Sequence, residues 1–348
     1  ENTLSKVIFW QRRRKNKKQI RIIISLSICL LLIMTVGYAA FNTNLSINAK
    51  GNIKDYNAAW QLKKKVITSG DGLYKDNYED ERYIYRGQEP NNYIVFNDEL
   101  WQIIAIEEDD ALKIIKKDSV NSIAWDLATN RNNDNNTYCN RIYTFNDKEQ
   151  YLGCNVWSAQ PGNFTDGQNQ GTVSTDASLN TYLNTEYYEG LKDKEYIISH
   201  SYNIGKVISS NDPKIADIYK QEKLNTWTGK VGLFTISDFL KASTNENCNS
   251  INNSRSITET PCTLENGNYL DAIKKETWTM IPYSATSSIN AAATAYVRTV
   301  GAYLGNGIKG GVSGYPVITA YQVRPVVHLK PEIKLIGSGT KDDPYVIK

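Results

Sequence analysis

The uncharged apolar run over residues 22–40 constrains this chain more than any other part of the sequence. It reads IIISLSICLLLIMTVGYAA. A helix of about 20 residues, rising about 1.5 Å per residue, spans a hydrocarbon core about 30 Å thick. The run therefore predicts a single transmembrane helix.

A basic cluster directly precedes this run. Residues 1–21 contain eight lysines and arginines against one glutamate, whereas the whole chain has a formal charge of only +3. Because cationic clusters beside a spanning helix stay in the cytoplasm, the sequence predicts a single-pass protein of the bacterial cell membrane with an extracellular C-terminal domain. That domain is mildly acidic, which argues against a nucleic-acid-binding surface.

The fate of the apolar helix is open at this stage. Gly37 and Ala39 supply small residues at the −3 and −1 positions of a signal-peptidase site. The sequence AAFN at 39–42 also resembles the signal region of camelysin and TasA-type matrix proteins. The apolar run is long for a signal peptide that is removed, so we expect it to be retained as an anchor.

Composition divides the chain into four parts. Residues 1–21 form a basic cytoplasmic tail, 22–40 a transmembrane helix or uncleaved signal anchor, and 41–69 a polar stalk or linker. The residue composition changes at a Ser-Gly-Asp-Gly sequence, after which residues 70–348 are expected to form one extracytoplasmic domain. That length is sufficient to bury a sizeable core.

Apolar and polar residues alternate with the two-residue period of β-strands at the start of this domain. Polar turn residues separate the runs, which predicts an antiparallel meander. The runs cover residues 83–85, 93–96, 100–106 and 112–115.

Short helices are expected in the middle of the domain, where a capping residue or proline precedes an apolar face. They begin near Ser178, Pro213 and Ser237. The last third returns to strand patterns at 278–281, 295–300, 317–329 and 332–336. The predicted fold class is therefore α+β, with a mainly antiparallel sheet and short helices after a single transmembrane helix.

The cysteines indicate an oxidising compartment. Cys139 and Cys154 form one sequence-local pair, and Cys248 and Cys262 form another. Outside the reducing cytosol such pairs persist as disulfides, so we predict both bonds, with Cys29 free in the apolar run. A zinc site is the alternative, but the intervals are wider than zinc motifs use.

Several ordered motifs resemble a domain of unknown function that recurs in surface proteins of gut Firmicutes. The resemblance covers roughly residues 70–348 and implies an exported, membrane-tethered or secreted domain without an established activity. The motifs include Asp71-Gly72-Leu73-Tyr74, Tyr85-Arg86-Gly87, Leu100-Trp101-Gln102, Tyr182-Leu183-Asn184, Ser237-Asp238-Phe239 and Asp343-Pro344-Tyr345.

A second resemblance concerns the fold alone. The order of Trp278-Thr279, Tyr296-Val297-Arg298 and Val323-Arg324-Pro325 is similar to the end of C-type lectin-like and formylglycine-generating-enzyme-like domains. It implies a C-type lectin-like fold with Arg324 before the final strand. Fold likeness carries no function, and the paired catalytic cysteines of the formylglycine enzymes are missing near this C-terminus.

No pattern predicts a catalytic centre, a cofactor or a metal site. The only histidines are His200 and His328, and we expect each to pack beside a strand. The glycine-rich residues 305–310 match a dinucleotide fingerprint in their letters, but no helix pattern follows, so they indicate a hairpin or loop. We therefore expect a protein that is not an enzyme, although paired carboxylates are not excluded.

Aromatic residues supply the candidates for ligand binding. Stretch 283–316 is rich in small polar residues and glycine, which is typical of long surface loops. Trp157 lies in a polar segment and is the candidate for an exposed tryptophan, with a place in the core as the alternative. The candidates are Trp157, Tyr283, Tyr303, Asn306 and Tyr315.

Other aromatic residues have the apolar context of packed strands and are assigned to the core. These structural residues are Trp101, Trp125, Trp227, Trp278 and Arg324, the last from its place in the lectin-like pattern.

The leading hypothesis is a non-enzymatic cell-surface module for ligand binding or adhesion, with a glycan or surface protein as partner. The first alternative is a cell-envelope glycan hydrolase that uses two carboxylates. The second is a structural matrix or fibre subunit released by signal cleavage.

Overall fold

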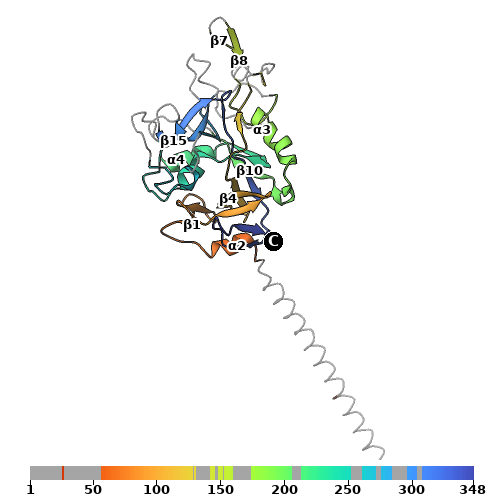
Figure 1. Ribbon diagram of the computed structural model, residues 1–348, viewed down its shortest axis with the longest axis vertical. Helices are drawn as coiled ribbons and strands as arrows, with labels where there is room; N and C mark the ends of the chain where they lie inside the picture. Colours follow the sequence, from red (N-terminus) through yellow and green to blue (C-terminus); the bar gives the residue numbers. More distant parts are fainter. Residues whose placement is uncertain are drawn as a thin grey trace, which may run out of the picture. The chain divides into compact units, whose positions relative to one another are not determined.

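The computed structural model describes Leu26 and most of residues 56–348. Within 56–348, the residues outside the description are 128, 131–141, 146–147, 152, 160–173, 206–212, 252–260, 272–275, 284–295 and 304–307. The chain forms two compact units, 1–55 and 56–348. The second unit holds the sheets (Figure 1).

The larger sheet has ten strands. Its path runs β12-β17-β5-β4-β3-β19-β18, while β2 pairs with β4, β9 pairs with β17 and β1 pairs with β2. The strands are β1 Gly72–Lys75, β2 Tyr83–Arg86, β3 Tyr93–Phe96, β4 Glu99–Ile106, β5 Leu112–Lys116, β9 Ile197–Ile198, β12 Val231–Gly232, β17 Val326–Leu329, β18 Leu335–Ile336 and β19 Tyr345–Ile347.

A five-stranded sheet runs β15-β14-β13-β16-β6, and β7 with β8 and β10 with β11 form two-stranded sheets. Their bounds are β6 Ser122–Ala124, β7 Ile142–Phe145, β8 Lys148–Tyr151, β10 His200–Asn203, β11 Thr226–Gly229, β13 Thr277–Tyr283, β14 Tyr296–Tyr303, β15 Ile308–Pro316 and β16 Ala320–Gln322.

The helices are short. They are α2 Ala58–Lys63, α3 Ser178–Tyr182, the π-helix η1 Leu183–Tyr187, the 3₁₀ turns η2 Lys194–Tyr196 and η3 Tyr269–Asp271, α4 Ile215–Glu222 and α5 Ile236–Lys241. The described chain is therefore mostly β, and the predicted α+β class is wrong. The helix-start signals lie within two residues of the observed helix starts, but such signals do not set helix length.

The predicted transmembrane helix is not supported. Across the part of the chain that the structure describes, no helix has both the length and the apolar character needed to cross a membrane. Residues 22–40 lie outside the described residues except for Leu26.

The antiparallel meander is confirmed at β3, β4 and β5. β3 pairs with β4 from Tyr93↔Gln102 onwards, and β4 pairs with β5. The two residues between β3 and β4, Asn97 and Asp98, both have φ of 58°. That left-handed pair is the conformation of a type I′ turn, whose twist matches the flanking strands.

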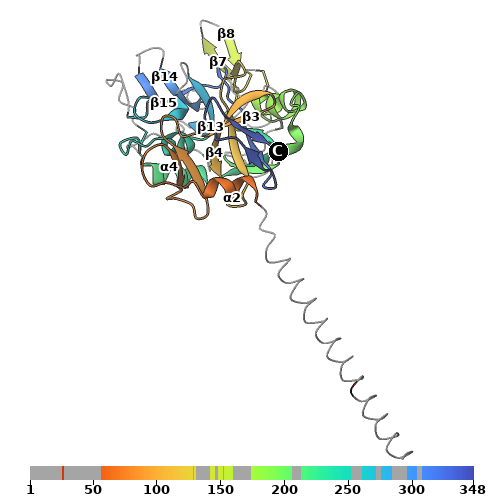
Figure 2. The ribbon, with the colours of Figure 1, turned by 60° about the horizontal axis from the view of Figure 1, so that its bottom comes forward.

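Strands from the end of the chain complete this sheet. β17 pairs with β5 through Val326↔Ile115, and β19 runs parallel to β3 through Tyr345↔Ile94. Figure 2 shows β3 close to the C-terminus. The meander therefore depends on residues more than 200 positions away in the sequence for its neighbours.

The C-terminal part of the segment assigned to a stalk belongs to the compact unit, which begins at Tyr56. Helix α2 buries Ala58, Ala59 and Leu62, and the Ala58 amide donates to the Ile333 carbonyl at 2.7 Å. The lysines that follow this helix made the segment look solvated, but its apolar face packs on the domain.

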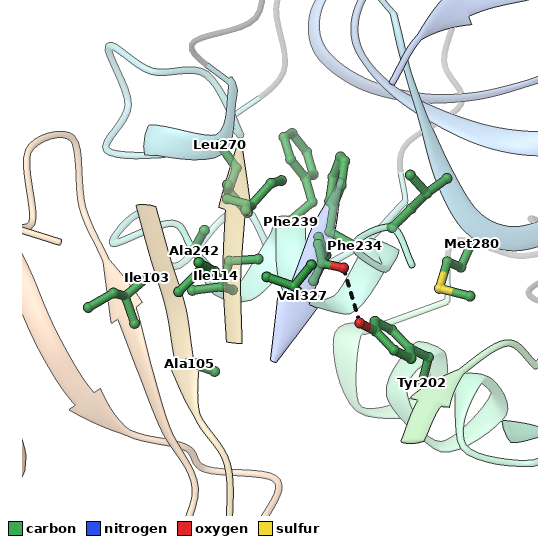
Figure 3. Close-up of a cluster of buried hydrophobic side chains, with 14 of the residues drawn as sticks. Ile103, Ala105, Ile114, Tyr202, Phe234, Phe239, Ala242, Leu270, Met280 and Val327 are labelled. Atoms are coloured by element: carbon green, nitrogen blue, oxygen red, sulfur yellow. Dashed lines mark hydrogen bonds between the residues drawn. The ribbon is translucent and has the colours of Figure 1, made fainter. Parts of the chain in front are cut away.

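The core lies between the larger sheet and the segments that cover it. Ile103, Ile114 and Val327 of the sheet and Phe234 and Phe239 from the α5 region are all fully buried and belong to one cluster (Figure 3). The Tyr202 hydroxyl donates to the Val326 carbonyl at 3.0 Å, so the polar end of this side chain is satisfied.

One predicted disulfide is confirmed, between Cys248 and Cys262. Cys154 is also disulfide-bonded, but Cys139 lies outside the described residues, so the pairing of these two stays a prediction. Cys29 lies outside the described residues as well.

Candidate functional site

A pocket of about 420 Å³ lies beside the β3–β4 turn and the π-helix η1. We call it the β4–η1 pocket. Its lining is Asn97, Glu99, Lys116, Ser119, Val120, Tyr182, Glu186, Tyr187, Gly190 and Leu191. Volumes of about 300–1,000 Å³ are typical of small-molecule sites.

The type I′ turn fixes one wall of the pocket. The Asn97 amide donates to the Asp193 carboxylate at 2.6 Å, and the Lys192 amide donates to the Asn97 side-chain oxygen at 2.7 Å. Lys192 also forms an ion pair with Asp98. The turn is therefore held against the segment that follows the helix.

Helices α3 and η1 supply another part of the lining, through Tyr182, Glu186 and Tyr187. Ser178 is the first residue of α3 and does not cap it; the N-cap is Ala177, which makes no side-chain capping bond. At Leu183 the helix widens into a π-helix. π-Helical turns are rare and occur frequently at functional sites.

Two asparagines hold this helix in place. The Asn180 amide group donates to the Trp157 carbonyl at 3.0 Å. The Asn184 side chain donates to the Val231 carbonyl at 2.9 Å and accepts from the Val231 amide at 3.0 Å. Both anchors act through side chains, so the helix can present its other face to the pocket.

The pocket combines charge, aromatic surface and a free hydroxyl. Lys116 pairs with Glu99 at 2.9 Å, and the rings of Tyr182 and Tyr187 are 6.3 Å apart. The Tyr187 hydroxyl is buried and has no hydrogen-bond partner in the described part of the chain. Burial and the Glu99 carboxylate raise the pKa of Tyr187, so this hydroxyl stays protonated and can donate.

The predicted ligand residues do not come together at this pocket. Trp157 is only 1% exposed and contacts the rings of Trp125 and Trp227, so its predicted exposure is wrong. The polar sequence around it misled the prediction, because the segment 153–159 is buried against the core. Its place in the interior excludes a direct contact with a surface ligand.

The glycine-rich stretch also differs from the prediction. Tyr283 ends β13, Tyr303 ends β14 and Tyr315 lies in β15, so much of 283–316 forms paired strands and not long loops. The hairpin expected near 305–310 is confirmed by the pairing Tyr303↔Ile308. Asn306 lies outside the described residues.

The residues assigned to the core are buried. Trp101, Trp125 and Trp278 are fully buried, Trp227 is 4% exposed and Arg324 is 1% exposed. The Trp278 indole donates to the Ile123 carbonyl at 2.9 Å. These side chains therefore shape the domain interior.

A second cluster of charges lies inside the domain, and no sequence pattern predicts it. Arg82 contacts Asp76 at 2.7 Å and Glu107 at 2.8 Å. We call the cluster the Arg82 network; its members are Asp76, Arg82, Glu107, Lys113, Asp238 and Lys241.

Cations and carboxylates balance in the Arg82 network. Lys113 pairs with Asp238 at 2.6 Å, and Lys241 pairs with Asp76 at 2.8 Å. Burial opposes ionisation, but the neighbouring cations outweigh it and lower the pKa of Asp238 and of Asp76. These carboxylates are therefore ionised, paired and enclosed.

The two histidines stack on each other beside this network. Their ring centroids are 3.9 Å apart, and His328 Nε2 lies 3.7 Å from Glu107. Burial lowers the pKa of His328 to about 4, so it is neutral at physiological pH. Both pack beside strands, as expected, and the described residues contain no cluster suited to hold a metal ion.

Sequence reasoning missed the β4–η1 pocket. Its walls come from a turn, the end of β5 and a helix about 85 residues later, and no local pattern joins them. The Asn-Asp turn was the one usable signal. Comparison with known proteins does not add a function, because no family model, curated protein or solved structure matches this chain.

Proposed function

We propose that this chain is a non-enzymatic ligand-binding or adhesion protein of the bacterial cell surface and that the β4–η1 pocket is its ligand site. The buried, unpartnered Tyr187 hydroxyl in the pocket wall carries the proposal. An unsatisfied buried hydroxyl costs about 1–3 kcal/mol. A ligand that hydrogen-bonds to this hydroxyl, after a rotation of the half-buried Tyr187 side chain toward the pocket, removes this cost.

The lining favours a glycan. Sugar rings offer apolar faces that stack on aromatic rings and hydroxyls that bond to amides and carboxylates. Tyr182 and Tyr187 supply the aromatic surface, while Asn97, Glu99 and Glu186 supply polar atoms. Few polar groups at fixed positions, with aromatic surface between them, are typical of specific small-molecule sites.

The disulfide supports a location outside the cytosol. Cys248 and Cys262 are bonded, and such bonds form and persist in oxidising compartments. A surface protein is exposed to the polysaccharides of its own envelope and of its surroundings. Export and glycan binding are therefore consistent parts of one proposal.

Binding of the full-length chain to a panel of immobilised glycans tests the proposal. Replacing Tyr187 by Phe removes one hydroxyl and should weaken binding about tenfold, the equivalent of about 1.4 kcal/mol. Tyr182→Ala should weaken it at least as much, because stacking is lost.

The matched control is Tyr188→Ala, on the same helix but outside the pocket lining. It should bind as the parent protein does. The proposal is overturned if no glycan binds, or if all three variants bind equally well.

One observation favours the hydrolase alternative. Glu99 and Glu186 line the same pocket, and glycoside hydrolases act through two carboxylates. Release of soluble fragments from cell-wall polysaccharide, lost in both Glu99→Gln and Glu186→Gln, would establish that activity. Binding without release supports the non-enzymatic proposal.

A further inference from the structure

The charges that line the β4–η1 pocket do not cancel. The lining contains two carboxylates, Glu99 and Glu186, and one lysine, Lys116. Lys116 and Glu99 neutralise each other through their ion pair at 2.9 Å. Glu186 is exposed and forms no ion pair with any residue that the structure describes. One negative charge of the lining is therefore left for a ligand.

The end of the helix adds to this negative potential. Its helical turns run from Ser178 to Glu189, and Gly190, which follows them, lines the pocket. The carbonyl end of a helix carries a partial negative charge that favours a cation. The lysines that come next in the chain, Lys192 and Lys194, are each paired with a carboxylate outside the lining.

The pocket tyrosines have no cation of the chain over their rings. The next residue, Tyr188, has one, because Lys194 Nζ lies 5.9 Å from the centroid of its ring. No such contact is made to Tyr182 or Tyr187 by the residues that the structure describes. The face of an aromatic ring attracts cations. These two partly exposed rings can therefore receive a cation from a ligand.

An aromatic ring and the uncompensated carboxylate lie on the same side of the helix. Tyr182 and Glu186 are four residues apart, a spacing that makes side chains neighbours on a helix surface, and both line the pocket. A sugar that stacks on Tyr182 can therefore reach Glu186 with a charged substituent of the same ring.

We propose that the ligand of the β4–η1 pocket is an amino sugar whose amine is free and protonated. This inference rests on the proposed glycan-binding function and names the class of sugar. The sugar ring stacks on Tyr182 and its ammonium group donates to Glu186, and such charge-assisted hydrogen bonds are roughly twice as strong as neutral ones. The N-acetylated form of the same sugar has no charge and lacks this interaction.

Calorimetric titration of the full-length chain with two oligomers of equal length tests the inference. One consists of β-1,4-linked glucosamine and the other of β-1,4-linked N-acetylglucosamine. At a mildly acidic pH, where the free amines are protonated, the glucosamine oligomer should bind about tenfold more tightly. The preference should shrink as sodium chloride is added, because salt screens exposed charges.

Variants separate the charge from the stacking. Glu186→Gln should weaken binding of the glucosamine oligomer about tenfold and leave the N-acetylated oligomer unchanged. Tyr182→Ala should weaken both oligomers alike, because stacking serves both. Glu189→Gln is the matched control, since this exposed carboxylate on the same helix lies outside the lining and is paired with Lys194. It should bind as the parent protein does.

The outcomes distinguish this inference from the proposed function. If neutral glycans bind at least as tightly as the glucosamine oligomer, the amino-sugar inference is overturned while glycan binding stands. The inference is also overturned if the preference for glucosamine survives Glu186→Gln, or if Glu189→Gln reduces it equally, since the charge then attracts the ligand elsewhere. If no glycan binds at all, both proposals fail.

Discussion

The Arg82 network and the β4–η1 pocket both contain ion pairs, but they differ in what surrounds the charges. In the network, Arg82 and Asp76 are 5% and 0% exposed, and each carboxylate has a cation beside it. In the pocket, Glu99 is 42% exposed, and the Tyr187 hydroxyl has no partner in the described chain. Balanced charges support a fold, whereas an unpartnered polar group in a pocket wall favours a ligand that satisfies it.

Desolvation explains the difference. An ion taken out of water must find its compensation within the protein, so an interior charge tolerates little change in its partners. A pair in which one partner keeps part of its hydration, as Glu99 does beside the mostly buried Lys116, contributes less to stability. Mutations in the Arg82 network should therefore lower the stability of the protein, whereas mutations in the β4–η1 pocket should weaken ligand binding.

The largest effect is expected from Arg82→Met. Removing this cation leaves Asp76 and Glu107 enclosed with fewer cations, which should lower the free energy of unfolding by about 3–5 kcal/mol. Urea unfolding measures the change. A loss below about 1 kcal/mol would mean that the network does not support the fold.

Glu222 sharpens the comparison, because it is a fully buried carboxyl without a cation in the described part of the chain. Burial raises its pKa to about 7, although the Ser237 amide donates to it at 3.0 Å. Since the folded pKa lies above the unfolded value of 4.5, its contribution to stability is complete below about pH 4.5 and declines as the pH rises to about 7.

Glu222→Gln should remove this decline. At pH 8 the variant should be more stable than the parent protein by about 3 kcal/mol, since one pKa unit corresponds to about 1.4 kcal/mol. Below pH 4.5 the two should be similar. Urea unfolding across this pH range measures the difference in stability between the variant and the parent protein. A variant that is less stable than the parent protein at pH 8 would contradict the prediction.

Tyr187→Phe probes the pocket with a smaller change. Removing an unsatisfied hydroxyl should stabilise the free protein by about 1 kcal/mol, while glycan binding weakens about tenfold. Stability and binding should thus change in opposite directions. If both fall together, the hydroxyl has a structural partner and the pocket does not differ from the network in the way described.

The smallest effect is expected for Lys116→Met, which breaks the pocket ion pair. Because Glu99 keeps contact with water, the free energy of unfolding should fall by only about 0.5 kcal/mol. Measured under the same conditions as Arg82→Met, this variant shows how much less the pocket ion pair contributes to the free energy of unfolding than the Arg82 network does. Similar losses of unfolding free energy in both variants would mean that the Arg82 network and the β4–η1 pocket do not differ in this respect.

Local patterns correctly located several elements. The alternation at 93–96 and 100–106 found β3 and β4, because a two-residue period depends only on neighbouring side chains. The capping signal near Ser237 lies within one residue of α5, where Thr235 and Asp238 form a capping box. The Cys248–Cys262 disulfide followed from proximity in the sequence.

Other assignments failed because burial overrides composition. Trp157 sits in a polar segment but packs between two tryptophans, and α2 is followed by lysines yet enters the core. Polarity along the chain averages over side chains that point in different directions. Which of them meets solvent depends on the segments that cover it.

The sequence by itself determined the strand meander, the hairpin turns and one disulfide, since these depend on residues near each other in the chain. The tertiary structure decided the mostly β class, the β4–η1 pocket and the Arg82 network. Asn97 meets Asp193, and Arg82 meets Asp238, only when distant segments pack together. Charge balance and free hydrogen-bonding groups are properties of those contacts, and no periodicity encodes them.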